Sequence, residues 1–376
     1  DHHTPPDILP PANIILNPKP YGEHHPLYPL PGAGVAYMLA AGLYETMGKT
    51  IHEGQWLDLV ALGIIADVVP VLGECRYLLR KGLPYLLKPE RTGLKALYDV
   101  LNSSGSQVVD EEDIAFQVSP RINAAGRMDS PYLPAELLLE QDPHRAAKMA
   151  ADLDRLNRQR KALQNHIFET AAEMVDRDQA NEGILVLYHP KWHEGVLGIV
   201  AGKIAETYKR PAICLTLKGD DSTVTGSARS VGDVSIYELL VESQDYLIKF
   251  GGHKQAAGMS LAIEDVEAFT RHIQGLLPIE EGMQESLVDI DVEIDISRVD
   301  DLLLRRIERM APFGHQFPKP VFSSQNVDIV SQRPIGKSHQ RFIFSGGDSQ
   351  LNGIWWWASV EANDNLEKGN IVYTLG

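Results

Sequence analysis

One long helical pattern in the middle of the chain constrains the fold more than any other feature. Apolar residues recur at helical spacing from Pro143 to about Asp176, and the Asp142-Pro143 pair ahead of them suits a helix start. The pattern is about three times as long as an average helix in a globular protein. We therefore predict a solvent-bridging helix over residues 141–180 that connects two domains.

Strand and helix patterns alternate on both sides of this segment. Before it, we expect a short buried strand at 13–17 and apolar helices at 32–47, 56–71 and 76–87. After it, we expect strands at 183–188, 211–217 and 224–230 and helices at 196–208, 236–248 and 266–277. Such alternation predicts α/β layers.

An acidic linker at 278–285 precedes a third part of the chain. Its expected elements are strands at 287–294, 321–330, 341–344, 351–357 and 371–375 and a helix near 299–310. Short strands at this spacing resemble a small β-barrel. The predicted fold class is α/β, with two α/β domains joined by a long helix and followed by a β-barrel.

Composition bounds the class of protein. Hydrophobic residues make up 44% and charged residues 23% of the 376 residues, as in globular proteins. No run reaches the roughly 18 apolar residues of a membrane span, and Cys75 and Cys214 fit a reducing cytoplasm. The net charge of −16 argues against a generally basic surface, but a local basic channel is compatible with it. Because no initial Met is present, we expect the numbering to begin inside a longer protein.

Two stretches near the start carry groups that suit a metal ion. Asp1-His2-His3 sets two imidazoles beside a carboxylate, a donor set suited to Mn²⁺. Asp67 closes the apolar run 57–65, where a carboxylate needs a partner that a metal could supply. The alternatives are a remnant of an expression tag at the start and an N-cap aspartate at position 67.

Four further stretches carry groups that suit an anion. Residues 119–128 hold two arginines without helix periodicity, and we expect either a phosphate-binding loop or a solvated surface loop. Residues 192–200 follow a strand and open a helix, so they form either an anion site or a tight turn. Residues 226–230 end a strand with Ser227 and Arg229, and 250–258 set two glycines before His253. A phosphate chain is the ligand that these groups have in common.

Together these motifs resemble the DHH phosphoesterase superfamily, and within it the RecJ family of single-strand-specific exonucleases. The matching pieces are Asp1-His2-His3, residues 66–70, 120–127, Gly251-Gly252-His253 and Ala311-Pro312-Phe313-Gly314. The resemblance covers essentially the whole chain. It implies a DHH domain without its N-terminal part at 1–140, a connecting helix at 141–180, a DHH-associated substrate-binding domain at 181–279, and an OB-like nucleic-acid-binding domain at 285–376.

The resemblance also implies roles for individual residues. His2 and Asp67 would bind metal in a site for two Mn²⁺ or Mg²⁺ ions, and His3 and His253 would be catalytic. The residues expected to hold the strand and its 5′ phosphate are Arg127, Gln159, Lys203, Ser227, Arg229 and Lys254.

Two departures from the family pattern matter. Its first aspartate motifs should precede residue 1, so we expect this fragment to be inactive alone. The family's Gly-Asn-Pro is replaced by Gln316-Phe317-Pro318, which puts the contacts of that segment in doubt.

The activity implied is 5′→3′ degradation of single-stranded DNA to 5′-mononucleotides in recombination and repair. Trp355, Trp356 and Trp357 are candidates for base stacking, although alternation along a strand would put at least one of them in the core. Expected partners are single-stranded DNA, single-strand-binding protein and a helicase, and we expect a monomer. The alternatives are a phosphoesterase for short oligonucleotides or nucleotides and a non-catalytic scaffold in a replication complex.

Overall fold

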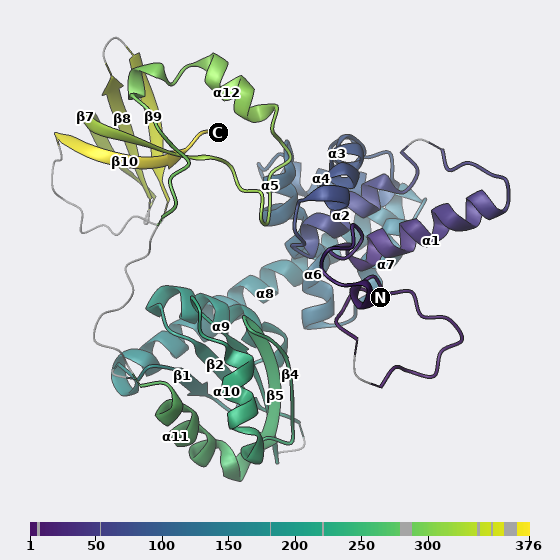
Figure 1. Ribbon diagram of the computed structural model, residues 1–376, viewed down its shortest axis with the longest axis vertical. Helices are drawn as coiled ribbons and strands as arrows, with labels where there is room; N and C mark the ends of the chain where they lie inside the picture. The colour runs from purple at the N-terminus through teal and green to yellow at the C-terminus, as the bar shows by residue number, and fades with distance from the viewer. Residues whose placement is uncertain are drawn as a thin grey trace. The chain divides into compact units, whose positions relative to one another are not determined.

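The protein forms two compact units, each with one β-sheet. A computed structural model describes residues 1–5, 8–52, 54–180, 182–219, 222–278, 288–336, 339–346, 349–356 and 367–376 (Figure 1). The first unit comprises Asp1–Pro89, Val109–Ala115 and Ser286–Gly376, and the second comprises Glu90–Val108 and Phe116–Glu285. The mixed α/β class is thereby confirmed. No helix in the described part of the chain is both long and apolar enough to cross a membrane.

The sheet of the second unit has the strand order β1-β2-β3-β5-β4. Its strands are β1 Leu185–Tyr188, β2 Ala212–Leu217, β3 Thr223–Arg229, β4 Lys249–His253 and β5 Ala256–Ala262. The β1–β2 pair is parallel, and helix α9 Glu194–Tyr208 provides the crossover that a parallel pair needs. The other pairs are antiparallel, with β4 at the edge.

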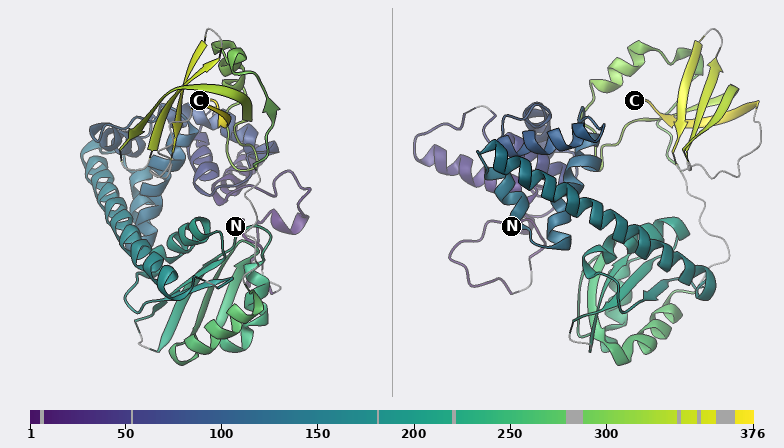
Figure 2. Two further views of the ribbon diagram at one scale, coloured as in Figure 1. Left: turned by 90° about the vertical axis from the view of Figure 1, so that its left-hand side faces the viewer. Right: turned by 180° about the vertical axis from the view of Figure 1, so that it is seen from behind.

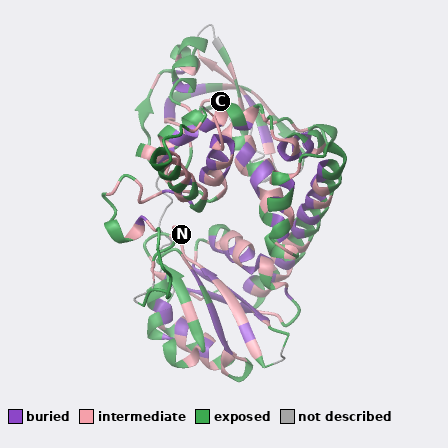
Figure 3. Ribbon diagram, turned by 90° about the vertical axis from the view of Figure 1, so that its right-hand side faces the viewer, coloured by how far each residue is buried: buried purple, intermediate pink, exposed green. Residues whose placement is uncertain are grey.

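Helices cover both faces of this sheet. Leu185, Leu187 and Cys214 pack with α9 and the end of α8 Pro143–Asp178. Their chain neighbours pack on the opposite face with α10 Ile236–Glu242 and α11 Val266–Leu276. Side chains alternate between faces along a strand, so a sheet covered twice needs continuous apolar strands, and β1 and β2 are of this kind (Figure 3).

The long helix is present as α8, and it is continuous over its whole length (Figure 2). Asp142 caps it, since its carboxylate accepts hydrogen bonds from the backbone N–H of His144 at 2.8 Å and of Arg145 at 3.1 Å. Helices α4 Thr92–Ser103, α6 Ser119–Met128 and α7 Tyr132–Leu139 also pack on α8. Its residues Ile167, Ala171 and Val175 pack on the core of the sheet, so one helix carries both groups of contacts. The predicted long helix is therefore present, and its role as a connector between two domains stays a prediction.

The first unit begins with the predicted helices, found as α1 Gly32–Thr46, α2 Leu57–Ala66 and α3 Gly73–Leu87. The strand predicted at 13–17 was wrong, because the segment pairs with no strand among the described residues and Ile14 is 80% exposed. An apolar β pattern needs a neighbouring strand to satisfy its backbone groups, and the sequence of the segment cannot supply one.

The sheet of the first unit follows the order β10-β7-β8-β9, with β6 paired to β7. These strands are β6 Val292–Glu293, β7 Val321–Ile335, β8 His339–Gly346, β9 Ser349–Trp355 and β10 Lys368–Thr374. Helix α12 Asp301–Glu308 precedes β7. The remaining elements of the chain are η1 Lys19–Tyr21, α5 Glu111–Asp113, η2 Ile114–Val118, η3 Gln244–Tyr246, η4 Ile263–Asp265 and η5 Ile296–Arg298.

The segment between α12 and β7 docks on α3 through Arg76. This guanidinium donates to the carbonyl oxygens of Met310 and Pro312 and lies 3.8 Å above the ring of Phe317. Phe317 thus supplies a cation–π contact that helps to hold this segment on α3. In the same segment, Gln316 adopts a φ of 59°, a backbone conformation that favours glycine.

Candidate phosphate- and metal-binding sites

His2 and Asp67, the two residues that the sequence analysis expects as metal ligands, lie close together in the first unit. His2 Nδ1 is 3.3 Å from Asp67 Oδ2, and Asp67 follows directly on the last residue of α2. His3 points its Nδ1 to Asp1 Oδ1 at 2.8 Å, and its ring centroid lies 4.3 Å from that of His2. Burial lowers the pKa of His2 and the charge of Asp67 opposes that change, which favours a neutral imidazole with an available lone pair.

The backbone beside Asp67 is strained. Val68 adopts a φ of 53°, which a β-branched residue rarely takes, and its side chain is exposed. Such strain persists where the surroundings enforce it, and it is frequent at functional sites. The geometry thus marks the turn after α2, where Asp67 meets His2, as a candidate site.

The donor atoms fit part of a metal-ion site. Two ligands at right angles around Mg²⁺ or Mn²⁺ lie about 3 Å apart, given metal–ligand distances of about 2.1 Å. The separation of 3.3 Å between His2 Nδ1 and Asp67 Oδ2 is close to that value. Within the described ranges, however, no group of three or more His, Cys, Asp and Glu side chains is arranged to hold a metal. His2 and Asp67 therefore make a half-site that needs further ligands.

Residues 119–128 form a helix, so the prediction of a loop there was wrong. This helix, α6, has Pro120 in its first turn and buries Ser119, Ala124 and Ala125. It packs on α8 and on α9. Its fully buried apolar residues are two adjacent alanines, so the segment has little helical periodicity, and its contacts in the second unit decide its conformation.

Arg127, Ser227 and Arg229 converge around the start of α9. Arg127 Nη1 donates to the Gly195 carbonyl oxygen at 3.3 Å, and Arg229 Nη1 donates to Ser227 Oγ at 3.3 Å. A Cβ atom at Gly198 would lie 2.8 Å from Arg229 Nη2 and 2.9 Å from Ser227 Oγ. The missing side chain at 198 thus makes room for both groups.

A second glycine brings α6 and α9 together. A Cβ atom at Gly195 would lie 2.0 Å from the carbonyl oxygen of Arg127, so only glycine permits this approach. The first turn of α9 is therefore fixed beside Arg127. Backbone N–H groups without helical partners lie in that turn, where an anion is favoured.

This group of residues carries uncompensated positive charge. Burial lowers the pKa of Arg229, and the charge of Arg127 lowers it further. Burial also lowers the pKa of Arg127, although its side chain reaches solvent. In the described part of the chain neither guanidinium pairs with a carboxylate. Both remain protonated at neutral pH and can bind phosphate oxygens.

His253 shares a sheet face with Arg229. Both residues pair with Ala256 on β5, and directly opposed residues of antiparallel strands point to the same side. His253 is exposed at the β4–β5 turn, after Gly252, whose φ of 153° suits glycine. Lys254 Nζ lies 3.3 Å from Asp233 Oδ1 in an exposed pair. The predicted His253 and Lys254 thus lie at the edge of the sheet that carries Arg229.

Two predicted residues have other contacts. Gln159 is exposed on α8 and accepts a hydrogen bond from Arg155 at 3.4 Å. Lys203 lies on α9 with its Nζ 3.9 Å above the ring of Phe168. The adjacent Arg160, which the sequence analysis did not select, is buried among polar groups of α8. The sequence does hold a signal for Arg160, because Asn157 lies three residues before it and Gln164 four residues after it, so all three side chains share one helix face.

Trp355 and Trp356 are solvent-accessible. Trp355 ends β9 and is 54% exposed, and Trp356 is 60% exposed with its ring 4.9 Å from that of His339. Alternation along the strand predicted that at least one of the three tryptophans lies in the core, and neither Trp355 nor Trp356 does. Trp357 lies outside the described residues.

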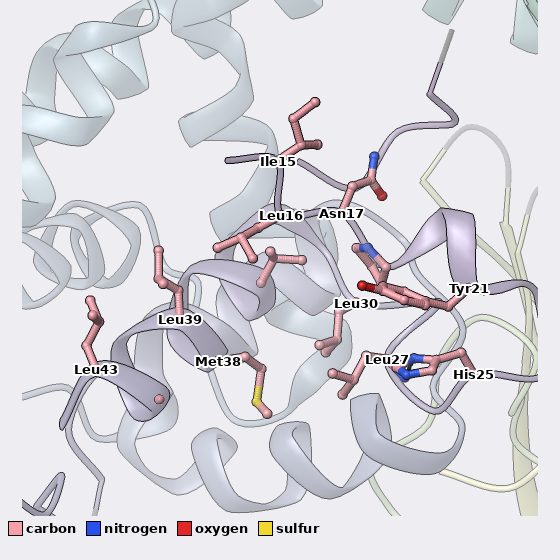
Figure 4. Close-up of a pocket in the computed structure, with 13 residues that line it drawn as sticks. Ile15, Leu16, Asn17, Tyr21, His25, Leu27, Leu30, Met38, Leu39 and Leu43 are labelled. Carbon is pink, nitrogen blue, oxygen red and sulfur yellow. Dashed lines mark hydrogen bonds between the residues drawn. The ribbon is translucent and has the colours of Figure 1, made fainter. Parts of the chain in front are cut away.

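A cavity of about 370 Å³ lies in the first unit, between α1 and the chain that precedes it (Figure 4). Its lining is mainly aliphatic, with Leu16, Leu30, Met38 and Leu39 among the contributors, and includes no Asp, Glu, Lys or Arg. An apolar cavity of this kind does not suit a phosphate chain. The chemistry lies at the charged groups instead.

Comparison with known protein families identifies two parts of the chain. A DHHA1 domain model matches residues 181–277, and a RecJ OB domain model matches residues 290–376. The first range contains Ser227, Arg229 and His253, and the second contains β6 to β10.

Whole-chain comparisons agree with these matches. The chain is 34% identical to the single-stranded-DNA-specific exonuclease RecJ of Bacillus subtilis, over 100% of its own length and 48% of that protein. It is similar to the Mn²⁺ complex of Thermus thermophilus RecJ, with a TM-score of 0.79, 27% identity and coverage of 100% and 54% of the two chains. A manganese-bound exonuclease RecJ has 31% identity and a TM-score of 0.59, with coverage of 73% and 67%. The chain thus spans about half the length of the Bacillus relative.

Proposed function

Because this chain belongs to the RecJ family of exonucleases, we propose that its protein degrades single-stranded DNA from the 5′ end to 5′-mononucleotides. The reaction would depend on Mn²⁺ or Mg²⁺ and would serve recombination and DNA repair. Relatives of this chain bear the name single-stranded-DNA-specific exonuclease, and two solved structures similar to it contain Mn²⁺.

The observation that carries the proposal is the cationic group at the start of α9. Arg127 and Arg229 point donors to this region without a carboxylate partner among the described residues, and Ser227 adds a hydroxyl. A terminal phosphate offers the oxygens that such donors need. We assign these three residues to the 5′ phosphate, with Lys254 as an outer contact and His253 near the reacting end.

His2 and Asp67 would hold one side of the metal site, together with ligands beyond this pair. The bound metal would activate water and stabilise the charge that develops on the phosphate. His3 would contact the phosphate being cleaved or the attacking water. Since the described residues offer only a half-site, we propose that residues 1–376 alone bind single strands without hydrolysing them.

The last sheet would guide the strand. Trp355 and Trp356 are exposed aromatic side chains, and stacking on such rings is tolerant of sequence. We also propose a cytoplasmic location, which the free, buried thiols of Cys75 and Cys214 fit. Single-strand-binding protein and a helicase are proposed partners, because they expose and present single strands, and a monomer is the proposed state.

The test is metal-dependent release of mononucleotides from single-stranded DNA. A protein extended to the length of its RecJ relatives is compared with residues 1–376 and with an extended His3→Ala variant. The DNA is labelled at either end and offered as a single strand or as a blunt duplex, with Mn²⁺, Mg²⁺ or a chelator.

We expect digestion of the single strand from the 5′ end, with loss of activity in the chelator and in His3→Ala. Equal digestion of the duplex, or release from the 3′ end first, would contradict the proposal. Activity restricted to very short oligonucleotides would favour the small-substrate phosphoesterase. Strand binding by the extended protein without any hydrolysis would favour the scaffold.

A further inference from the structure

A polar stripe lies on the buried side of α8. Asp154, Asn157, Arg160 and Gln164 follow one another at spacings of three and four residues, which places them on one helix face. The exposed fractions of Asp154, Asn157 and Arg160 are 7%, 1% and 8%. Polar groups are rarely buried without a purpose, since each must be satisfied inside the protein.

Neutral partners hold the guanidinium of Arg160. Its Nε and Nη2 donate to Asn157 Oδ1 at 3.2 and 3.0 Å, and its Nη1 donates to Gln164 Oε1 at 3.0 Å. Amide oxygens satisfy these N–H groups and leave the positive charge uncompensated. A carboxylate at either position would have neutralised it.

The carboxylate of the stripe is already engaged. Asp154 accepts from Arg121 Nε at 2.9 Å and forms an ion pair with Arg158 Nη1 at 3.0 Å. Across the described residues, Arg160 forms no ion pair with a carboxylate. A buried cation without a counter-charge is costly, so an anion is expected to complete the site when the protein works.

Arg160 lies on the helix against which the elements of the phosphate-binding group pack. Helix α6, which carries Arg127, contacts α8, and so does α9, which contacts β3 with Ser227 and Arg229. The charge of Arg127 acts on Arg160 and also on Arg229, in each case adding to the effect of burial in lowering the pKa. Three guanidiniums thus share one region of the second unit. An anion placed there interacts favourably with all three charges.

We propose that Arg160 is a positioning residue that strengthens the Arg127–Ser227–Arg229 site for the terminal phosphate of a DNA strand. Its donors are occupied by Asn157 and Gln164, so it acts through its fixed charge. A terminal phosphate monoester carries more negative charge than the diesters within a strand, and it therefore gains most from the third cation. The inference rests on the proposed function and deepens it.

The test compares the affinity for one strand whose 5′ end carries or lacks a phosphate. Residues 1–376 are titrated, without metal, with a single-stranded oligonucleotide that bears either a 5′ phosphate or a 5′ hydroxyl. The readout is the dissociation constant for the 5′-hydroxyl strand divided by that for the 5′-phosphate strand. The thermal unfolding of each variant is measured beside it. A change in folding alone does not alter this ratio.

Four variants separate charge from structure. Arg160→Gln removes the charge, Arg160→Lys keeps it, and Asn157→Asp neutralises it with a carboxylate while the guanidinium stays in place. Arg158→Gln is the matched control, because Arg158 lies on the same helix with a side chain that is 72% exposed.

In the wild type we expect tighter binding of the phosphorylated end. Arg160→Gln and Asn157→Asp are expected to reduce the ratio about tenfold, which corresponds to about 1.4 kcal/mol, while Arg160→Lys and Arg158→Gln largely retain it. If Arg160→Gln does not fold, Asn157→Asp still decides.

The proposal is overturned if both charge-removing variants keep the wild-type ratio, even when their melting temperatures fall. It is also overturned if the wild type binds the 5′-phosphate and the 5′-hydroxyl strands equally tightly. Neither result decides the nuclease function, which the hydrolysis assay of the extended protein tests separately.

Discussion

Replacing Gly198 by alanine should separate anion binding from folding. The added Cβ would lie 2.8 Å from Arg229 Nη2 and 2.9 Å from Ser227 Oγ, distances too short for a carbon atom. The atoms that must move are the end of a flexible guanidinium and a hydroxyl, so the backbone can stay in place. Both groups belong to the proposed phosphate site.

The two consequences have opposite signs. Alanine is favoured over glycine inside a helix by up to about 1 kcal/mol, so the free energy of unfolding should be unchanged or slightly higher. A lost hydrogen bond from a charged donor is worth about 1.5–3 kcal/mol. The dissociation constant for a 5′-phosphorylated oligonucleotide should therefore rise about 10- to 150-fold.

Gly202→Ala is the matched control, because it lies one turn further along α9. A Cβ there would lie 3.8 Å from Arg229 Cγ, an ordinary contact, and it offers the same gain in helix propensity. Titration with the phosphorylated oligonucleotide and urea unfolding are measured for both variants. Wild-type affinity in Gly198→Ala would refute the assignment of Arg229 and Ser227, and equal losses in both variants would point to the helix instead.

Three further predictions concern other parts of the chain. Gln316→Gly should raise the free energy of unfolding by about 1 kcal/mol in urea, because the φ of 59° at this position strains any residue with a Cβ; a lower value would contradict this. The pKa of Asp142 is lowered by hydrogen bonds from the backbone N–H of Arg145 and of His144, so its stabilising effect is present above about pH 4 and is lost as the pH falls through its folded-state pKa. Asp142→Asn keeps the cap and should flatten the melting temperature as a function of pH below 4, whereas an unchanged acid slope would assign the loss to other carboxylates. Trp355→Ala and Trp356→Ala should each weaken binding of oligo-dT by about 1–3 kcal/mol in a fluorescence titration if bases stack on them, and unchanged affinities would remove them from the strand path.

Local patterns predicted much of the secondary structure. The helices at 32–47 and 143–176 were found within a few residues, as were the strands at 211–217 and 224–230. Backbone hydrogen bonding imposes a period of 3.6 on a helix and of 2 on a strand, and these periods remain visible in the order of apolar residues. Motifs with unusual residue types, such as Asp1-His2-His3 and Gly251-Gly252-His253, identified the family.

Segments whose conformation depends on distant partners were predicted less well. Residues 119–128 lack a clear period, and only packing on α8 and α9 makes them helical. Residues 13–17 have a strand pattern, but a strand also needs a neighbour, and no described residues provide one. Local sequence contains no information on either partner.

The candidate sites show the same division between local and tertiary information. From the sequence alone came Asp67, Arg127, Ser227 and Arg229, because arginines, hydroxyls and isolated carboxylates at the ends of elements are recognisable there. Only the tertiary structure shows that Arg160, and not its exposed neighbour Gln159, faces the protein interior. Successive helix residues point about 100° apart, and the packing of α6 on α8 decides which of them is buried. Tertiary structure likewise gave Gly195 and Gly198 their roles, since the space that a missing side chain leaves has meaning only once the neighbouring elements are in place.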